Sequence, residues 1–205
     1  GVGPESRIGI LSRNGRTFVV ALVAAAKLGA DSLLLNASFS ASQVHAVLER
    51  EGADAVAAEE EFAAIGDDLA QLPIGGSHPA GPPPPPGRVG RQVILTSGTT
   101  GVPKGARRQS SGSLGALVSL LSRVPLRAGE TTVIASPVFH AWGLAHLSVG
   151  LVLGSTIVLR ARFDPQQALD DIADRKATAL VAVPIMLQRL LSVPADRRPD
   201  TSCLR

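Results

Sequence analysis

Short apolar runs alternate with longer segments of helical periodicity along the whole chain. The runs are rich in leucine and β-branched residues and are bounded by polar residues or glycine, which is typical of strands buried between helices. The predicted strands are residues 7–12, 32–35, 53–57, 92–96, 131–135, 156–159 and 179–183. The predicted helices are residues 16–28, 41–51, 111–123, 144–153, 165–175 and 185–191. Regular alternation of this kind predicts an α/β fold with mainly parallel sheets.

Helix ends in the first half carry recognisable signals. Gly29 follows the first predicted helix, where a residue that tolerates left-handed dihedrals is expected. Ser40 or Ser42 can cap the helix at 41–51, whose apolar residues lie on one face. The acidic residues 59–61 favour a solvated turn or the start of a helix over a metal site.

Composition bounds the class of protein. Hydrophobic residues make up 45% of the 205 residues and charged residues 18%, so the chain can bury a sizeable core. The net charge is only +3, the basic residues are dispersed and aromatics are 3%, which argues against binding to nucleic acid. A single cysteine, Cys203, excludes a disulfide framework and fits the reducing cytoplasm. Lys27 and Asp31 interrupt the most apolar stretch, so we expect no transmembrane segment and see no signal peptide.

A change of composition divides the chain at residues 73–87. This segment holds several glycines and an unbroken run of five prolines, residues 82–86, which can join neither a helix nor a central strand. We expect an exposed, polyproline-like surface loop that acts as a spacer. The alternative is a ligand for an adaptor protein.

The residues best suited to chemistry follow the predicted strand at 92–96. Hydroxyl groups, glycines and one ammonium group come together here: Thr96, Ser97, Gly98, Thr99, Thr100, Gly101, Lys104 and Gly105. Glycines allow successive N–H groups to face one side and form an anion-binding nest, and Thr99 or Thr100 could reach a bound Mg²⁺. Lys104 stands before Gly105, so the spacing is not that of a Walker loop. The alternative is a surface turn without a ligand.

This stretch also resembles a known signature. Residues 96–105 (TSGTTGVPKG) are similar to the phosphate-binding motif of the adenylate-forming superfamily, which includes acyl-CoA synthetases, luciferases and peptide-synthetase adenylation domains. Residues 137–143 (PVFHAWG) resemble the Pro-x-Phe-His-x-x-Gly segment of that family. Residues 7–36 followed by 40–55 are similar to its first α/β unit, and residues 183–187 and 201–205 stand in the expected order. Residues 31–38 and 105–108 resemble fatty acyl-CoA synthetases.

The resemblance implies ATP-dependent activation of a carboxylic acid, with a fatty acid favoured. An acyl-adenylate forms first, and coenzyme A then displaces AMP; ATP, Mg²⁺ and coenzyme A are the implied cofactors and co-substrate. By carry-over, the hydroxyls and glycines of 96–101 and Lys104 hold the β- and γ-phosphates, and Thr100 reaches the metal. His140 is implied beside the acyl carboxylate, where it gates and orients, with Trp142 and Gly143 bordering the acyl site.

The later motifs of the family are absent from these 205 residues. Residues 1–205 therefore resemble part of the large N-terminal AMP-binding domain, without the small C-terminal domain, and we expect no acyl-CoA formation by them alone. Two alternatives stay open. The acyl group could pass to a carrier protein, or the chain could be a non-catalytic remnant or partner subunit. The sequence does not predict an oligomeric state.

Overall fold

A computed structural model describes residues 2–65, 69–74, 81, 85–96, 104–108 and 121–205. The chain divides into two compact units, Gly1–Ser110 and Ser111–Arg205, and each unit is described by itself. Among the described residues, every helix is too short or too polar to span a bilayer. The α/β class predicted from the alternation is confirmed in both units.

The first unit is built on one six-stranded sheet of order β4-β3-β1-β2-β5-β6. Its strands are β1 (Arg7–Leu11), β2 (Asp31–Leu34), β3 (Ala55–Ala58), β4 (Ala70–Gln71), β5 (Gln92–Thr96) and β6 (Lys104–Arg108). The first five run parallel, and β6 pairs antiparallel with β5. The sheet is therefore parallel with one antiparallel edge strand.

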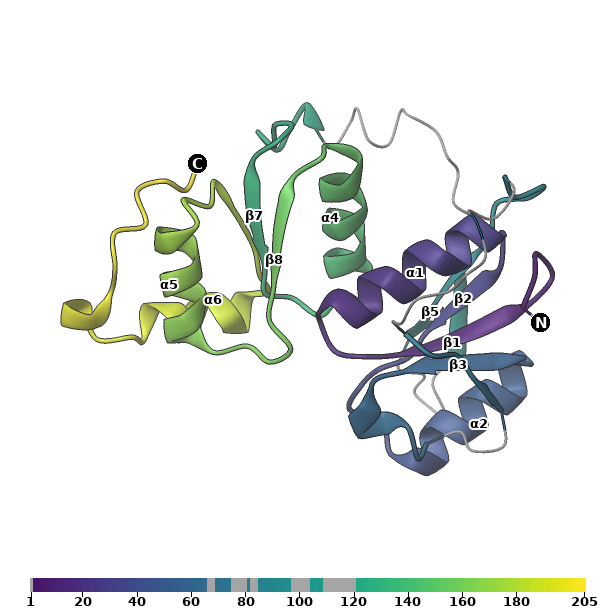
Figure 1. Cartoon of the computed structure of the whole chain (residues 1–205). Coiled ribbons are helices and arrows are strands. Elements are labelled where there is room, and N and C mark those ends of the chain that lie inside the picture. The colour runs from purple at the N-terminus through teal and green to yellow at the C-terminus, as the bar shows by residue number, and fades with distance from the viewer. Residues whose placement is uncertain (1, 66–68, 75–80, 82–84, 97–103, 109–120) are drawn as a thin grey trace. The chain divides into compact units, whose positions relative to one another are not determined.

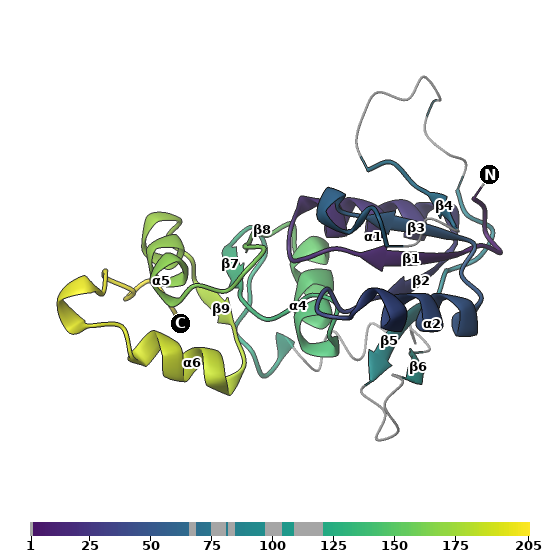
Figure 2. The same ribbon diagram turned by 90° about the horizontal axis from the view of Figure 1, so that it is seen from below.

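Two helices cover opposite faces of this sheet, as Figures 1 and 2 show: α1 (Arg16–Leu28) and α2 (Ala41–Glu51). Both agree with the predicted ranges. Gly29 ends α1 in a left-handed conformation with φ 72°, as expected. Ser40 caps α2, because its hydroxyl accepts the Gln43 N–H while the Gln43 side chain bonds back to the Ser40 N–H. A short 3₁₀ helix, η1 (Glu60–Phe62), follows β3.

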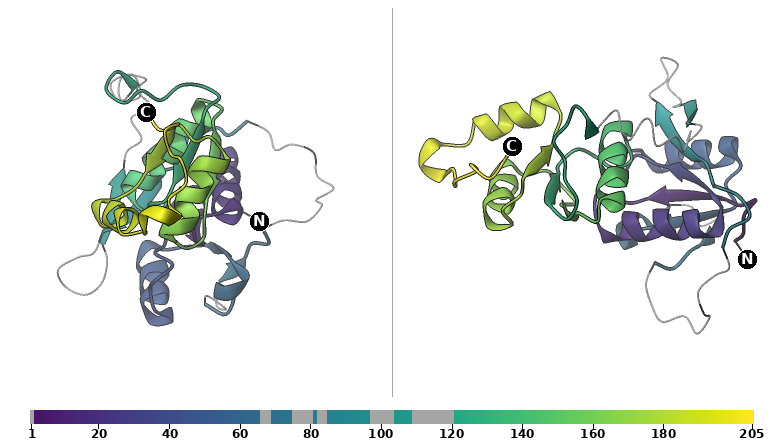
Figure 3. Two further views of the ribbon diagram at one scale, coloured as in Figure 1. Left: turned by 90° about the vertical axis from the view of Figure 1, so that its left-hand side faces the viewer. Right: turned by 90° about the horizontal axis from the view of Figure 1, so that it is seen from above.

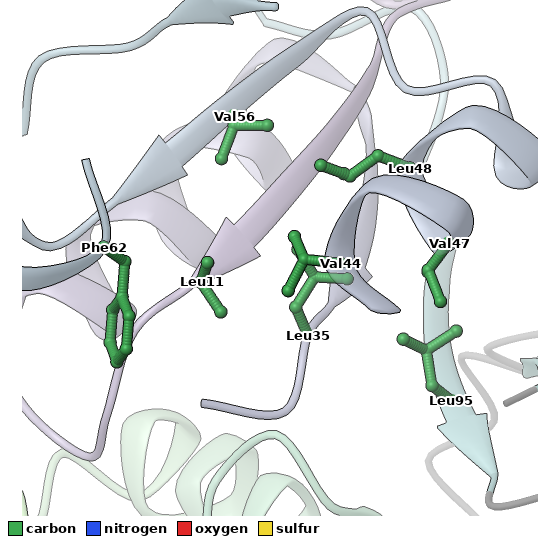
Figure 4. Close-up of a cluster of buried hydrophobic side chains, with 8 residues drawn as sticks. All are labelled: Leu11, Leu35, Val44, Val47, Leu48, Val56, Phe62 and Leu95. Carbon is green, nitrogen blue, oxygen red and sulfur yellow. The ribbon is translucent and has the colours of Figure 1, made fainter. Parts of the chain in front are cut away.

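The core between the sheet and α2 explains the helical pattern of α2. Figure 4 shows the cluster, which joins one apolar face of the helix to side chains from the sheet, from the end of β2 and from η1: Leu11, Leu35, Val44, Val47, Leu48, Val56, Phe62 and Leu95. Gly9 allows the close approach of the helix, because a Cβ there would lie 2.6 Å from Leu48 Cδ2. A larger residue at position 9 would force Leu48 to move.

The second unit repeats the architecture on a smaller scale. Its parallel sheet has the order β8-β7-β9, from β7 (Thr131–Ile134), β8 (Thr156–Leu159) and β9 (Ala179–Val181). Its helices are α4 (Ala141–Val152), α5 (Pro165–Asp174) and α6 (Pro184–Leu191), followed by η2 (Ala195–Arg197). Figure 3 shows α4 and α5 on opposite faces of the sheet.

Some of the predictions from the sequence are wrong, and others fall on residues that the structure does not describe. Strands β4 and β6 were not predicted, and α4 begins at Ala141 rather than at residue 144. The helix predicted over 111–123 falls largely outside the described residues, and residues 122 and 123 form a turn. Within the proline-rich segment, the described Pro73, Pro85 and Pro86 are exposed, and most of the other residues are not described.

Candidate functional site

The carboxyl ends of the parallel strands define one edge of the first sheet. β1, β2, β3 and β5 all end there, and β6 begins there because it runs the opposite way. Open α/β sheets bind their ligands outside the carboxyl ends of the strands. The residues that leave and enter the sheet at this edge are therefore the candidates for binding.

Thr96 and Lys104 meet at that edge. Thr96 is the last residue of β5, Lys104 is the first of β6, and the two are directly opposite in the ladder. The sequence placed them at the two ends of one motif, and the pairing brings their backbones together. Ser97, Gly98, Thr99, Thr100 and Gly101 fall within residues 97–103, outside the described residues.

A network of polar contacts ties the segments after β1 and β3 together at the same edge. The buried Ser12 hydroxyl donates to Glu59 Oε1 at 2.8 Å, and the Arg13 N–H donates to Glu59 Oε2 at 3.2 Å. The Arg13 guanidinium donates to Glu61 at 2.7 Å and lies 5.3 Å from the Phe62 ring centroid. The solvated turn or helix start predicted over residues 59–61 is the 3₁₀ helix η1, which begins at Glu60, and the Glu59 carboxylate is hydrogen-bonded to protein groups.

His140 lies in the second unit, in the connection that leaves the carboxyl end of β7. It is the N-cap residue of α4: its carbonyl accepts the Leu144 N–H at 2.9 Å, and its own N–H donates to Pro137 O at 3.2 Å. The side chain is exposed, with its ring centroid 4.5 Å from that of Phe139. The imidazole thus stands at the carboxyl edge of the second parallel sheet.

Close packing at the start of α4 requires a glycine at position 143, three residues after His140. A Cβ at position 143 would lie 2.4 Å from the Pro137 carbonyl oxygen and 3.0 Å from that of Ser136. Real Cβ atoms essentially never approach within 3.0 Å of another heavy atom in this way. Only glycine lets the first turn of α4 pack on the backbone that carries His140.

A second histidine, which sequence reasoning did not single out as functional, supports the same turn. His146 is buried, and its Nδ1 lies 3.0 Å from the Trp142 carbonyl oxygen. That oxygen can only accept, so Nδ1–H is the donor. The two rings meet edge to face at 4.2 Å, while the Trp142 side chain stays 50% exposed. The predicted helix began at residue 144, so the spacing of four residues became a signal for this pair only once α4 was seen to begin at Ala141.

Comparison with known proteins decides the family. The family described as AMP-binding enzyme matches the chain over residues 1–205. The chain belongs to this family. The resemblance to the adenylate-forming superfamily is therefore confirmed, together with the fold that it implied.

Individual AMP-binding relatives are longer than this chain. A feruloyl-CoA synthase from an Amycolatopsis species is 30% identical over 215 residues, which cover 100% of this chain and 44% of that protein. A fatty acid–[acyl-carrier-protein] ligase from Streptomyces coeruleorubidus is 29% identical and covers 100% of this chain and 43% of its own length. The chain thus spans less than half the length of these curated relatives.

A solved structure shares the fold of this AMP-binding chain. The o-succinylbenzoate coenzyme A synthetase from Bacillus subtilis, in complex with ATP and magnesium ion, superposes with a TM-score of 0.79. It is 22% identical, and the match covers 100% of this chain and 56% of that one.

The chemistry of His140 in this AMP-binding chain yields a prediction. Although the His140 side chain is exposed, the atoms packed around its imidazole remove part of its hydration, which disfavours the charged form and lowers the pKa below its ordinary value of 6.5. In a proton NMR titration we expect its midpoint below 6.5, with the signal assigned by its loss in His140→Gln.

Unfolding should bring the pKa of His140 back toward its ordinary value. The unfolded chain binds a proton first as the pH falls, so acidification through 6.5 should lower the free energy of unfolding contributed by this residue. A His140 midpoint in the folded chain at or above that of the urea-unfolded chain would contradict the assignment.

Proposed function

We propose that residues 96–104 bind the polyphosphate of MgATP, within an enzyme that activates a carboxylic acid. The observation that carries the proposal is the pairing of Thr96 with Lys104 at the carboxyl edge of a parallel sheet. Both ends of the loop therefore lie at the edge where such sheets bind ligands. The ATP and magnesium bound by the Bacillus subtilis neighbour support the choice of nucleotide.

The residue types fit an anion and a hard cation. Ser97, Thr99 and Thr100 supply hydroxyl donors, and Gly98 and Gly101 allow the backbone N–H groups to converge on phosphate oxygens. We assign the Thr100 hydroxyl to Mg²⁺, which prefers oxygen ligands. When bound, the metal neutralises phosphate charge. Lys104 adds a protein cation at the end of the loop.

His140 has a separate role in the proposal. Its lowered pKa leaves the imidazole neutral at pH 7, so it offers one N–H donor and one acceptor instead of a full charge. A neutral donor can orient the carboxylate of the substrate without fixing it as an ion pair. Trp142, exposed two residues further on, and Gly143 would border the acyl site.

The substrate is proposed to be a fatty acid, and the acceptor coenzyme A. The Streptomyces coeruleorubidus relative supports a fatty acid, and the Amycolatopsis relative supports coenzyme A. A carrier protein is the second candidate acceptor, because the first of these relatives is named for one. Side-by-side acceptor assays with coenzyme A and with a carrier protein separate the two.

The direct test is binding of MgATP by the 205-residue chain, measured by calorimetry, together with pyrophosphate release in the presence of a fatty acid. We expect saturable MgATP binding that weakens when Mg²⁺ is chelated, and no acyl-CoA formation by these residues alone. Absence of MgATP binding would refute the role of residues 96–104. Turnover by the purified chain would refute the expectation that groups beyond these residues are needed.

A non-catalytic partner subunit is the remaining alternative. It predicts that MgATP has no specific effect on the chain, so the same calorimetric titration distinguishes it from the proposed enzyme.

A further inference from the structure

The three central residues of β5 are buried on both faces of the sheet. Val93, Ile94 and Leu95 are exposed by only 5%, 8% and 7%, although successive side chains point to opposite faces. Both faces of this central stretch are therefore apolar, as expected for a strand between helix layers. No alternation of apolar and polar side chains distinguishes the two faces of these three residues, so contacts at the ends of the strand help to fix its register.

A buried carboxylate stands where β5 enters the sheet. Asp31 is the first residue of β2 and is only 9% exposed. Its Oδ1 accepts the N–H of Arg91 at 2.8 Å and also accepts from the Arg88 guanidinium. The Arg91 carbonyl in turn accepts the N–H of Ser32 at 2.8 Å, which begins the β2–β5 ladder.

Two further contacts hold the same segment. The Arg88 guanidinium also donates to the Pro4 carbonyl, just before β1. A Cβ at Gly90 would lie 1.9 Å from the Ala30 carbonyl oxygen, so residue 90 packs directly on the backbone before β2 and only glycine fits there. The segment before β5 is therefore fixed to the amino ends of both β1 and β2.

We propose that Asp31 and Arg88 are positioning residues that set the register of β5 and thereby the point at which Thr96 leaves the sheet. The inference rests on the proposed binding of MgATP after Thr96. A slip of one residue would move Thr96 by about 3.3 Å along the strand. Hydrogen bonds to phosphate tolerate only a few tenths of an ångström beyond about 3.2 Å, so such a slip would break them.

The test compares Asp31→Ala and Arg88→Ala with the unchanged chain in two measurements. The first is hydrogen–deuterium exchange of the amides at 92–96, and the second is the Kd of MgATP. We expect faster exchange in this strand and MgATP binding that is roughly three- to tenfold weaker. Arg88→Lys keeps a cation beside Asp31 and should restore most of the affinity.

Val56→Ala is the matched control for a general loss of stability. Val56 is fully buried on β3, which is separated from β5 by β1 and β2. It should leave the MgATP affinity within about twofold, since it removes core packing without touching the entry of β5.

Three results would overturn the inference: unchanged exchange at 92–96 in both alanine variants, unchanged MgATP affinity in both, or an equal loss of affinity in Val56→Ala. If the unchanged chain binds no MgATP, the proposed function fails. The exchange measurement then still decides whether Asp31 and Arg88 hold β5.

Discussion

Gly143→Ala should lower the free energy of unfolding of the second unit by about 1–3 kcal/mol. The added Cβ would lie 2.4 Å from the Pro137 carbonyl oxygen, so either α4 or the turn that carries His140 must shift. The sign is diagnostic, because alanine in a helix is otherwise favoured over glycine by up to about 1 kcal/mol. Urea unfolding monitored by Trp142, the single tryptophan of the chain, measures the change.

Gly150→Ala provides the control within the same helix. The tight contacts of a Cβ there would be with the Ile157 side chain, at 3.0 Å and 3.2 Å, and that side chain can rotate away; Ser155 Cβ would lie at an ordinary 3.9 Å. We expect a change smaller than about 1 kcal/mol in either direction. A Gly143→Ala chain as stable as the Gly150→Ala chain would show that the contact with Pro137 is not limiting.

Lys104→Ala should weaken MgATP binding by about 10- to 100-fold. A hydrogen bond to a charged group contributes about 1.5–3 kcal/mol, and each 1.4 kcal/mol corresponds to a factor of ten. Lys104 opens β6 opposite Thr96, so its removal takes a cation from the proposed phosphate site without interrupting the ladder. Calorimetric titration with MgATP gives the affinity directly.

Lys27→Ala is the control for net charge. Lys27 lies in the last turn of α1, which precedes β2 and so lies toward the amino edge of the sheet. Lys27→Ala removes the same charge from the same unit as Lys104→Ala does. We expect its MgATP affinity to stay within about twofold of that of the unchanged chain. Equal losses in the two variants would mean that Lys104 acts only through the overall charge of the chain.

The sequence predicted those elements whose hydrophobic pattern and end signals agree. α1 and α2 were predicted with their observed bounds because Gly29 and Ser40 mark their limits. β5 and β8 were also predicted in full, since each is a compact apolar run bounded by polar residues or glycine.

The missed elements lack those signals. β6 reads Lys-Gly-Ala-Arg-Arg and has no apolar alternation, so only its pairing with β5 defines it as a strand. α4 begins before Gly143, a residue that sequence rules treat as unfavourable inside a helix. Here the close packing on Pro137 outweighs that preference.

The sequence indicated the residue types of the candidate site, whose role in binding stays a prediction, but not the geometry of its two ends. The motif gave Thr96 and Lys104 as partners in binding, but their opposite positions follow from a strand that the sequence did not indicate. The contact between His146 and Trp142 was missed because Trp142 lies before the helix predicted over residues 144–153. Contacts of this kind depend on which side chains share one face of a helix, and a motif does not encode that.

The two described edges of the six-stranded sheet have a consequence for association between molecules. β4 is only two residues long, and three of the five residues of β6 are lysine or arginine. Short edge strands and edge strands rich in cations resist pairing with a strand from another chain. The strand that leads out of the proposed phosphate-binding loop therefore also protects an otherwise apolar sheet from aggregation through its open edge.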